Sequence, residues 1–352
     1  MIHDVCSMNY AMSRVAINGF GRIGRAFFRQ AFGRDDIEIV AINDLGDLEN
    51  LAYLLKYDSV YRRYDLPVGT ETVGDKRSLV VDGKHIAVVS EKEPTSLPWK
   101  DLKVDVVVES TGFFTDAEGA GKHITAGAKR VVITAPGKDG VTQLLVGTDD
   151  ARFAEDDLDA VTCNASCTTN AAAPAIAVLH EALGIEKGIV QTVHSYTSTQ
   201  SLVDGPGKKD DFLRGRAAAA NIVPSSTGAA EAVAKSIPAL EGKFTGIAIR
   251  VPTIAGSLAM FTGVVSKKTS VEAVNDLYRK AAAEPRWNGI LGVSEDALVS
   301  SDIIGRTEPA LIDLPSTRVV GGNLVTVYSW YDNEWGYTHS LVEHVARVAK
   351  RL

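Results

Sequence analysis

The first half of the chain alternates short apolar runs with segments whose apolar residues recur at helical spacing. Helical spacing is seen in GRIGRAFFRQAF (21–32) and LENLAYLLKYD (48–58). The strand-like runs are SRVAING (13–19), IEIVAIND (37–44), SLVVDGKHIAVVS (78–90), VDVVVEST (104–111), RVVITAP (130–136) and LLVG (144–147). Strands without strict polar alternation that are separated by helices predict a parallel sheet covered on both faces. This pattern is typical of a doubly wound, Rossmann-type α/β domain.

The second half of the chain has a different pattern. Helices are predicted over 171–183 and 270–284, whereas 201–220 is a long polar segment. The strand-like runs are 188–198, 246–253, 257–266, 310–315, 317–322 and 323–332. Because the last two runs meet at Gly-Gly, they predict a hairpin. We therefore expect an α+β domain with a mainly antiparallel sheet and helices on one face.

These patterns predict two domains, in agreement with a length of 352 residues. The nucleotide-binding domain is expected over 14–166 and the second domain over 167–333. The amphipathic C-terminal segment, 334–352, predicts a helix that packs back on the first domain. Residues 1–13 form an N-terminal extension, either a disordered tail or the product of a start codon upstream of Met12.

Composition narrows the class of protein. Charged residues make up 23% and hydrophobic residues 45% of the chain, as in ordinary globular proteins. The net charge of −7 argues against a nucleic-acid or membrane-surface partner. Three cysteines do not make a disulfide framework, and we find neither a signal-peptide core nor an apolar stretch of membrane-spanning length. We expect a cytoplasmic protein without a metal site.

Cys167 is the candidate nucleophile. It precedes hydroxyl residues and a small-residue helical segment, so we place it at a loop-to-helix junction. The N–H groups and the macrodipole of a helix N-terminus favour a thiolate there, and the thiolate is the reactive form of cysteine. Free cysteines are more often small buried hydrophobes, which is how we interpret Cys6 and Cys163.

A dinucleotide-binding motif follows the first predicted strand. Gly19, Gly21 and Gly24 give G-x-G-x-x-G at the start of a helix, where glycines allow the backbone to approach a pyrophosphate. Asp44 lies about 20 residues further on, where a carboxylate binds the ribose hydroxyls. Because no arginine follows it to hold a 2′-phosphate, the motif predicts NAD rather than NADP.

Several motifs together resemble one family. INGFGRIGR, AIND, SCTTN, TVHSYT, SSTGAA, RVPT and SWYDNEWGY occur in this order from about Arg14 to the C-terminus. The chain is similar to the phosphorylating glyceraldehyde-3-phosphate dehydrogenases. The resemblance implies a homotetramer that oxidises glyceraldehyde 3-phosphate with NAD and inorganic phosphate through a thioester on Cys167.

The resemblance also implies roles for individual residues. His194 is the base that acts on Cys167. The substrate phosphate and the attacking phosphate are held by Thr197 and Arg250, and by Ser166, Thr168, Thr227 and Gly228, respectively. Besides the motif glycines and Asp44, the implied cofactor residues are Arg22, Ile23, Lys92, Thr134, Asn333 and Tyr337. The family often has arginine in place of Lys92 and a second cysteine in place of Ala171.

Other functions remain open at this stage. Erythrose-4-phosphate dehydrogenase shares the cysteine, the histidine and the cofactor fold, but releases its product to water. A non-catalytic NAD-binding protein would not need Cys167, His194 and Arg250 together. A cysteine hydrolase would leave the dinucleotide motif unexplained.

Overall fold

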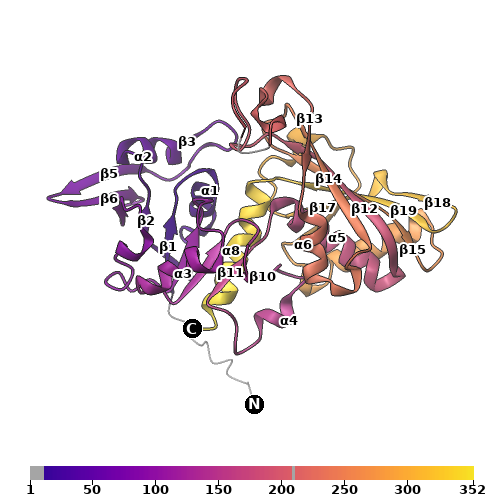
Figure 1. Ribbon diagram of the computed structural model, residues 1–352, viewed down its shortest axis with the longest axis horizontal. Coiled ribbons are helices and arrows are strands. Elements are labelled where there is room, and N and C mark those ends of the chain that lie inside the picture. The colour runs from indigo at the N-terminus through magenta and orange to yellow at the C-terminus, as the bar shows by residue number, and fades with distance from the viewer. Residues whose placement is uncertain (1–11, 208–210) are drawn as a thin grey trace, which may run out of the picture.

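A computed structural model describes residues 12–207 and 211–352 of the chain. Most of the expected N-terminal extension, Cys6 included, therefore lies outside the described residues. Two large sheets stand side by side, with the last helix between them (Figure 1). Within the described residues, no helix is both long enough and apolar enough to cross a membrane.

The first sheet has nine strands in the order β10-β11-β9-β8-β1-β2-β7-β6-β5. All neighbours from β10 to β7 are parallel, and β7, β6 and β5 are antiparallel. The strands are β1 (Ser13–Asn18), β2 (Ile37–Asn43), β5 (Val68–Val73), β6 (Lys76–Val81), β7 (Lys84–Val89), β8 (Val106–Glu109), β9 (Arg130–Ile133), β10 (Thr142–Gln143) and β11 (Val161–Cys163). Its helices are α1 (Arg22–Ala31), α2 (Leu48–Lys56), α3 (Ala117–Thr125) and α4 (Asp150–Phe153). The predicted doubly wound parallel sheet is confirmed.

The second sheet is mostly antiparallel, in the order β13-β14-β12-β15-β19-β17-β16, with β18 paired to β19. The pairs β12–β14 and β16–β17 are parallel. The strands are β12 (Ile185–Ser195), β13 (Val223–Ser226), β14 (Phe244–Val251), β15 (Ser257–Val265), β16 (Leu291–Ser294), β17 (Ala310–Asp313), β18 (Arg318–Val320) and β19 (Leu324–Tyr331). The expected β18–β19 hairpin is present.

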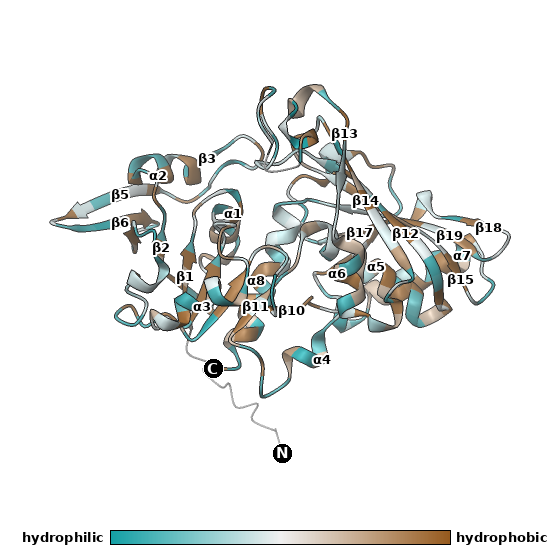
Figure 2. Cartoon of the chain, viewed as in Figure 1, coloured by the Kyte–Doolittle hydropathy of each residue, from teal (hydrophilic) through white to brown (hydrophobic). Residues whose placement is uncertain are grey.

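Helix α5 (Cys167–Leu183) is the central helix on this second sheet, because it contacts four of its strands. It also packs against α6 (Ala229–Ser236) and α7 (Val271–Ala282), so these helices share one face. The short strands β3 (Tyr57–Asp58) and β4 (Arg62–Arg63) form a separate ribbon. Figure 2 shows apolar residues along inner strands such as β1 and β11, and polar residues on α4.

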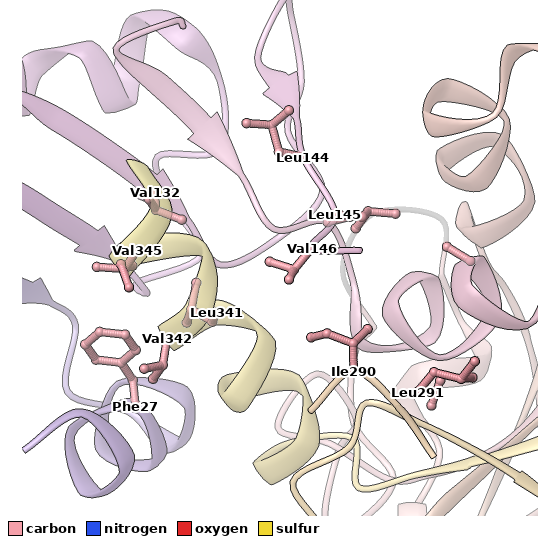
Figure 3. Packing of buried hydrophobic residues seen from close by; sticks show 14 of the residues in the cluster. Phe27, Val132, Leu144, Leu145, Val146, Ile290, Leu291, Leu341, Val342 and Val345 are labelled. Carbon is pink, nitrogen blue, oxygen red and sulfur yellow. The ribbon is translucent and has the colours of Figure 1, made fainter. Parts of the chain in front are cut away.

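The C-terminal helix α8 (Trp335–Ala349) packs on α1, β8 and β9 and also contacts α5. Its apolar residues join one core cluster that continues into both halves of the molecule. In Figure 3, Leu341 and Val345 of α8 lie near Val132, while Ile290 approaches Val146 from the second half. This shared core fixes how the two halves sit relative to each other.

One predicted strand is wrong. LLVG (144–147) is not a strand; β10 ends at Gln143 and the chain then turns. The amide N–H of Leu145 donates to Asp149 Oδ2 (2.8 Å), and Gly147 takes a φ of 82°. Leu144, Leu145 and Val146 are nevertheless fully buried. Their apolar character therefore reflects the core between the two halves and not a place in the sheet.

Candidate active site and cofactor pocket

Cys167 is the first residue of α5, four residues after β11 ends. Ser166 caps the helix, because its hydroxyl accepts a hydrogen bond from the Thr169 N–H (3.1 Å). The turn passes through Ala165 at φ 52°, a backbone conformation that costs energy in any residue with a Cβ. Tyr337 Oη donates to the Ala165 carbonyl (3.1 Å) and supports this turn. Cys167 thus sits at the positive end of a long helix dipole, as expected.

His194, near the end of β12, brings its ring to this cysteine. Its Nε2 lies 3.3 Å from Cys167 Sγ, and its Nδ1 lies 2.6 Å from the Ser195 carbonyl. Arg250 is directly opposite His194 in the parallel β12–β14 register. Its Nη1 is 2.9 Å from His194 Nδ1 and 3.2 Å from the Ser195 carbonyl.

These contacts select a tautomer of the neutral His194 ring. If Nδ1 carries the proton, it donates to the Ser195 carbonyl and leaves Nε2 free to accept the thiol proton of Cys167. Arg250 then donates to the same carbonyl and not to the ring. The other tautomer would leave the short Nδ1–O contact without a proton. The geometry therefore favours the base-competent form.

Burial disfavours a charge on either partner alone. It raises the pKa of the Cys167 thiol, against the opposing effects of Arg250 and the Thr168 N–H. It also lowers the pKa of His194 to about 3, and the Arg250 charge adds to this. A thiolate–imidazolium pair has no net charge, so one proton can pass between Sγ and Nε2 without charging the site. Cys167 keeps part of its surface open to solvent, as a nucleophile must.

The predicted phosphate ligands differ in how many of their hydrogen-bonding groups already have a partner within the protein. Arg250 Nε is buried and has no hydrogen-bond partner among the described residues, so it can donate to an anion. Thr197 is partly exposed, and among the described residues its hydroxyl forms a hydrogen bond only with that of Thr199 (2.9 Å). Thr227 and Gly228 lie at the start of α6, with Gly228 as the N-cap. The Thr227 hydroxyl accepts the Ala229 N–H (3.2 Å), so part of its hydrogen-bonding capacity is already used in the first turn of α6.

The hydroxyl groups of Ser166 and Thr168 have structural roles in and around α5. The Ser166 hydroxyl caps α5, and the Thr168 hydroxyl is buried 3.0 Å from Tyr331 Oη. Tyr331 Oη also lies 2.8 Å from Thr192 Oγ1, so Thr168 belongs to a packed network beneath the site. In this structure the side chain of Thr168 holds α5 in place. What it offers an anion is its backbone N–H near the helix start.

Arg214 was missed by the sequence analysis. It lies in the polar segment, donates to Ser225 Oγ (2.7 Å) and pairs with Asp211 (3.1 Å). Its Nη2 also donates to the Ser226 carbonyl (3.3 Å), next to Thr227, and β13 pairs with β14, the strand that carries Arg250. Its charge contributes to lowering the pKa values of both His194 and Arg250. The basic sequence LRGR within a glycine-rich loop was the available signal.

The dinucleotide motif opens into a pocket of about 630 Å³ at the carboxyl ends of β1, β2 and β8. A Cβ on Gly19, which has φ 92°, would meet Thr111 N at 2.8 Å, and one on Gly24 would meet the Gly19 carbonyl at 2.2 Å. A Cβ on Gly21 would meet nothing within 4 Å. The free space in front of Gly21, at the start of α1, fits a pyrophosphate.

Asp44, predicted to bind the ribose hydroxyls, lies in the wall of this pocket. Its carboxylate accepts the N–H groups of Phe20 (2.7 Å) and Gly46 (2.8 Å), which tie the ends of β1 and β2 together. Lys92 also lines the pocket, whereas Thr134 does not. The exposed Leu45 and Phe113 line it too and were not predicted; they offer apolar surface to a base.

Arg22 and Ile23 lie in the first turn of α1, but neither side chain is free. Ile23 packs against the core, and Arg22 is paired with Asp58 and Glu334. What these two residues offer a pyrophosphate is their backbone N–H groups, because the first N–H groups of a helix have no internal partner.

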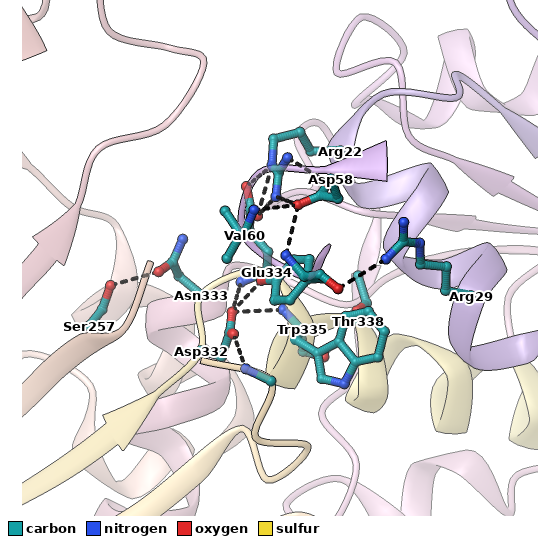
Figure 4. Close-up of polar contacts among 12 residues, drawn as sticks. Arg22, Arg29, Asp58, Val60, Ser257, Asp332, Asn333, Glu334, Trp335 and Thr338 are labelled. Carbon is teal, nitrogen blue, oxygen red and sulfur yellow. Dashed lines mark hydrogen bonds and ion pairs between the residues drawn. The ribbon is translucent and has the colours of Figure 1, made fainter. Parts of the chain in front are cut away.

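Asn333 lies beside the Arg22 ion pairs and has an oriented side-chain amide (Figure 4). Its Oδ1 accepts from Ser257 Oγ (2.9 Å), which leaves Nδ2 as the donor toward a ligand. Tyr337, predicted to pack beside the nicotinamide, is buried in α8 with its hydroxyl on the Ala165 carbonyl.

Comparison with known proteins identifies the family. Residues 13–117 match the family described as "Glyceraldehyde 3-phosphate dehydrogenase, NAD binding domain", and residues 166–333 match its "C-terminal domain". The chain is 48% identical to glyceraldehyde-3-phosphate dehydrogenase of Geobacillus stearothermophilus over 96% of this chain and 98% of the relative.

Two further relatives show how widely this similarity extends. Identity to glyceraldehyde-3-phosphate dehydrogenase 1 of Saccharomyces cerevisiae is 46% over 96% of this chain and 100% of the relative. Identity to the chloroplastic glyceraldehyde-3-phosphate dehydrogenase A of Zea mays is 48% over 95% of this chain and 81% of the relative. With both halves of the chain matched, the protein belongs to the glyceraldehyde-3-phosphate dehydrogenase family and is an NAD-dependent oxidoreductase of that family.

Proposed function

We propose that this protein converts glyceraldehyde 3-phosphate, NAD and inorganic phosphate to 1,3-bisphosphoglycerate and NADH. The observation that carries the proposal is the 3.3 Å contact between Cys167 Sγ and His194 Nε2 at the start of α5. A nucleophile, a base and a nearby guanidinium are the groups that acyl transfer to phosphate requires. The names of the relatives support this substrate over the tetrose phosphate.

Cys167 and His194 act together in each chemical step. Sγ adds to the aldehyde carbon while Nε2 takes the thiol proton and passes it to the carbonyl oxygen, giving a hemithioacetal. Bound NAD supplies the acceptor for the hydride that this carbon then loses. His194 removes the hydroxyl proton, which leaves a thioester on Sγ. Phosphate oxygen attacks the thioester, the C–S bond breaks, and Cys167 recovers its proton from His194.

The phosphate groups are held by the cations and N–H groups around this pair. We assign Arg250 and Thr197 to the substrate phosphate, and Thr227, Gly228, Ser166 and the Thr168 N–H to the attacking phosphate. We add Arg214 to these ligands, because it donates to Ser225 Oγ and to the Ser226 carbonyl, directly before Thr227. The free N–H groups at the start of α5 are suited to stabilise the oxyanion. NAD is held by the turn of Gly19, Gly21 and Gly24, and by Arg22, Ile23, Asp44, Lys92 and Asn333, with Thr134 and Tyr337 retained as predicted positions.

The test is NADH formation from glyceraldehyde 3-phosphate with and without phosphate. We expect turnover to require phosphate or arsenate, and an equal rate without either would contradict the proposal. Erythrose 4-phosphate serves as the competing substrate. Cys167→Ser should abolish turnover while NAD still binds. Cys163→Ser makes the same thiol-to-hydroxyl change in a buried cysteine outside the site and should remain active.

We further propose a homotetramer that works in the cytoplasm. Large apolar side chains of the polar segment and the neighbouring loop are exposed in the single chain, namely Leu202, Val203, Phe212 and Ile222. Ile189 and Ile247 are exposed on β12 and β14. Large exposed apolar side chains in this number support an interface between subunits. The cytoplasmic location is supported by the need to keep Cys167 reduced. Light scattering coupled to size-exclusion chromatography tests the assembly.

A further inference from the structure

A buried chain of polar side chains lies behind the cofactor pocket and takes no part in the chemistry proposed above. It consists of Trp99, His123 of α3 and Glu109 at the end of β8, all at most 1% exposed. Trp99 Nε1 donates to His123 Nδ1 (2.9 Å), and His123 Nε2 lies 3.0 Å from Glu109 Oε2. A buried carboxylate is costly unless its hydrogen bonds are complete. This chain therefore needs an explanation.

The contacts define the proton positions. The indole N–H can only donate, so His123 Nδ1 is an acceptor and the neutral ring carries its proton on Nε2. That proton points to Glu109. Asn18 Nδ2 also approaches His123 Nε2 (3.3 Å), but both nitrogens are then donors and share Glu109 Oε2 as acceptor, with Asn18 at 2.5 Å. The order of donation is Trp99 to His123 to Glu109.

Glu109 in turn accepts hydrogen bonds from residues in the wall of the cofactor pocket. Its Oε1 accepts the Thr111 N–H (2.9 Å) and the Thr111 hydroxyl, while Oε2 accepts Asn18 and His123. Thr111 and Asn18 both line the cofactor pocket. Asn18 Oδ1 in turn accepts from Asn43 Nδ2 (2.6 Å), and Asn43 is a third lining residue. One carboxylate thus sets the orientation of polar groups from three neighbouring strand ends.

We propose that Glu109, held by His123 and Trp99, is the positioning residue for the NAD pocket and sets affinity for NAD without acting in the chemical step. Glu109 is not itself among the residues that line the pocket. It acts through Thr111 and Asn18. Its hydrogen bonds orient these two residues so that their other polar groups face the ligand. This inference rests on NAD binding as part of the proposed function.

The test measures NAD affinity by calorimetry and steady-state kinetics in Glu109→Gln. Glutamine supplies one acceptor oxygen and two N–H donors, so at least one of the four donors loses its acceptor. We expect the Kd and KM for NAD to rise about five- to tenfold, with kcat changed by less than about twofold. The control is Tyr278→Phe, which removes a buried hydrogen bond to the Ala175 carbonyl in the second half of the molecule. It should lower Tm and leave the Kd unchanged.

Two further measurements keep the proposal testable if Glu109→Gln folds poorly. Trp99→Phe keeps an aromatic side chain but removes the indole N–H and so frees His123 Nδ1. Nitrogen NMR should show one Nε2–H tautomer of His123 in the wild type and a mixture in the variant. Its Kd for NAD should rise less than that of Glu109→Gln. In a Thr111→Val background the Glu109→Gln change should raise the Kd for NAD by a smaller factor than in the wild type, because the path through the Thr111 hydroxyl is already lost and that through Asn18 remains.

The outcomes separate the inference from the function on which it rests. An unchanged Kd in folded Glu109→Gln, a loss confined to kcat, or an Nδ1–H tautomer of His123 in the wild type would overturn the positioning role. Failure of the wild-type protein to bind NAD would instead overturn the proposed function.

Discussion

Arg22 and Glu334, which are 312 positions apart in the chain, form a paired hydrogen bond between the start of α1 and the residue that follows Asn333. Arg22 Nε lies 2.6 Å from Glu334 Oε1, and Nη2 lies 2.5 Å from Oε2. Burial acts to lower the pKa of Arg22, but the hydrogen bonds and charges of Glu334 and Asp58 outweigh it and raise the pKa. The ion pair therefore joins the dinucleotide turn to the segment that presents Asn333 (Figure 4).

Breaking this pair should weaken both the fold and the cofactor site. We expect Glu334→Gln to lower the free energy of unfolding by about 1–3 kcal/mol, because it leaves a half-buried guanidinium without its main partner. The KM for NAD should rise as Asn333 loses its fixed position. Urea denaturation and NAD titration check both effects. Glu295→Gln breaks an exposed pair with Arg279 and should change stability by less than about 0.5 kcal/mol.

Two of the motif glycines, Gly21 and Gly24, should respond differently to alanine. Gly21→Ala has room for its methyl group and a negative φ of −70°, so the free protein should lose less than about 1 kcal/mol of stability. Because that methyl fills the space where a pyrophosphate would lie, NAD affinity should fall at least about tenfold. Gly24→Ala instead places a methyl 2.2 Å from the Gly19 carbonyl and should destabilise the fold. Equal effects of the two variants on Tm would show that Gly21 is a packing residue.

Local pattern was enough to predict the first half of the fold. The strand at 13–18, the glycine turn and the helix at 22–31 follow each other within 19 residues. The spacing of apolar residues and the glycines of the turn are therefore sufficient to predict these elements. Long-range pairing is different. His194 meets Arg250 only because β12 and β14 pair in parallel in this register, and no local pattern encodes that pairing.

Side-chain partners account for most of what the sequence did not predict. Arg22 looks like a phosphate ligand because of its place in the motif, but Glu334 and Asp58 occupy its guanidinium. The apolar residues at 144–146 predict a strand, but in the structure they fill the core between the two halves of the molecule. In both cases the deciding contact comes from a residue distant in sequence.

Arg214 should matter for phosphate and not for NAD. Replacing it with glutamine removes a positive charge beside Ser225 and Ser226, directly before Thr227, so we expect the KM for inorganic phosphate to rise about tenfold or more. NAD affinity should stay unchanged. Arg216→Gln, two residues away and paired with Asp204 in solvent, is the control. If both variants gave the same phosphate KM, Arg214 would not be a phosphate ligand.

His194→Gln should separate proton transfer from binding. Glutamine can hydrogen-bond in the same place but cannot take a proton from Cys167, so kcat should fall about 10²- to 10⁴-fold. The rate of Cys167 alkylation by iodoacetamide should fall as well, while NAD affinity is retained. Single-turnover NADH formation measures the first effect. A kcat within about threefold of the wild type would rule out His194 as the base.

Two buried histidines should make the protein sensitive to acid. His344 Nδ1 donates to Asn164 Oδ1 (3.2 Å), and its Nε2 accepts from Thr162 Oγ1 (2.9 Å). Burial, with a smaller effect of Arg347, lowers the pKa of His344 to about 3. His194 has a pKa of about 3 as well, for which burial is again the main cause.

The sign of the effect follows from proton uptake. Below about pH 6.5 the unfolded chain protonates these histidines, whereas the folded protein does not until about pH 3. Stability is therefore complete above pH 6.5 and falls as the pH decreases, by up to about 1.4 kcal/mol per pH unit for each histidine. Urea denaturation at pH 7, 6 and 5 avoids most carboxylate titration. His344→Gln should reduce the slope of unfolding free energy against pH by the contribution of one histidine. His85→Gln, which changes an exposed histidine, should leave this slope unchanged. An unchanged slope in His344→Gln would mean that the fold does not hold this histidine neutral.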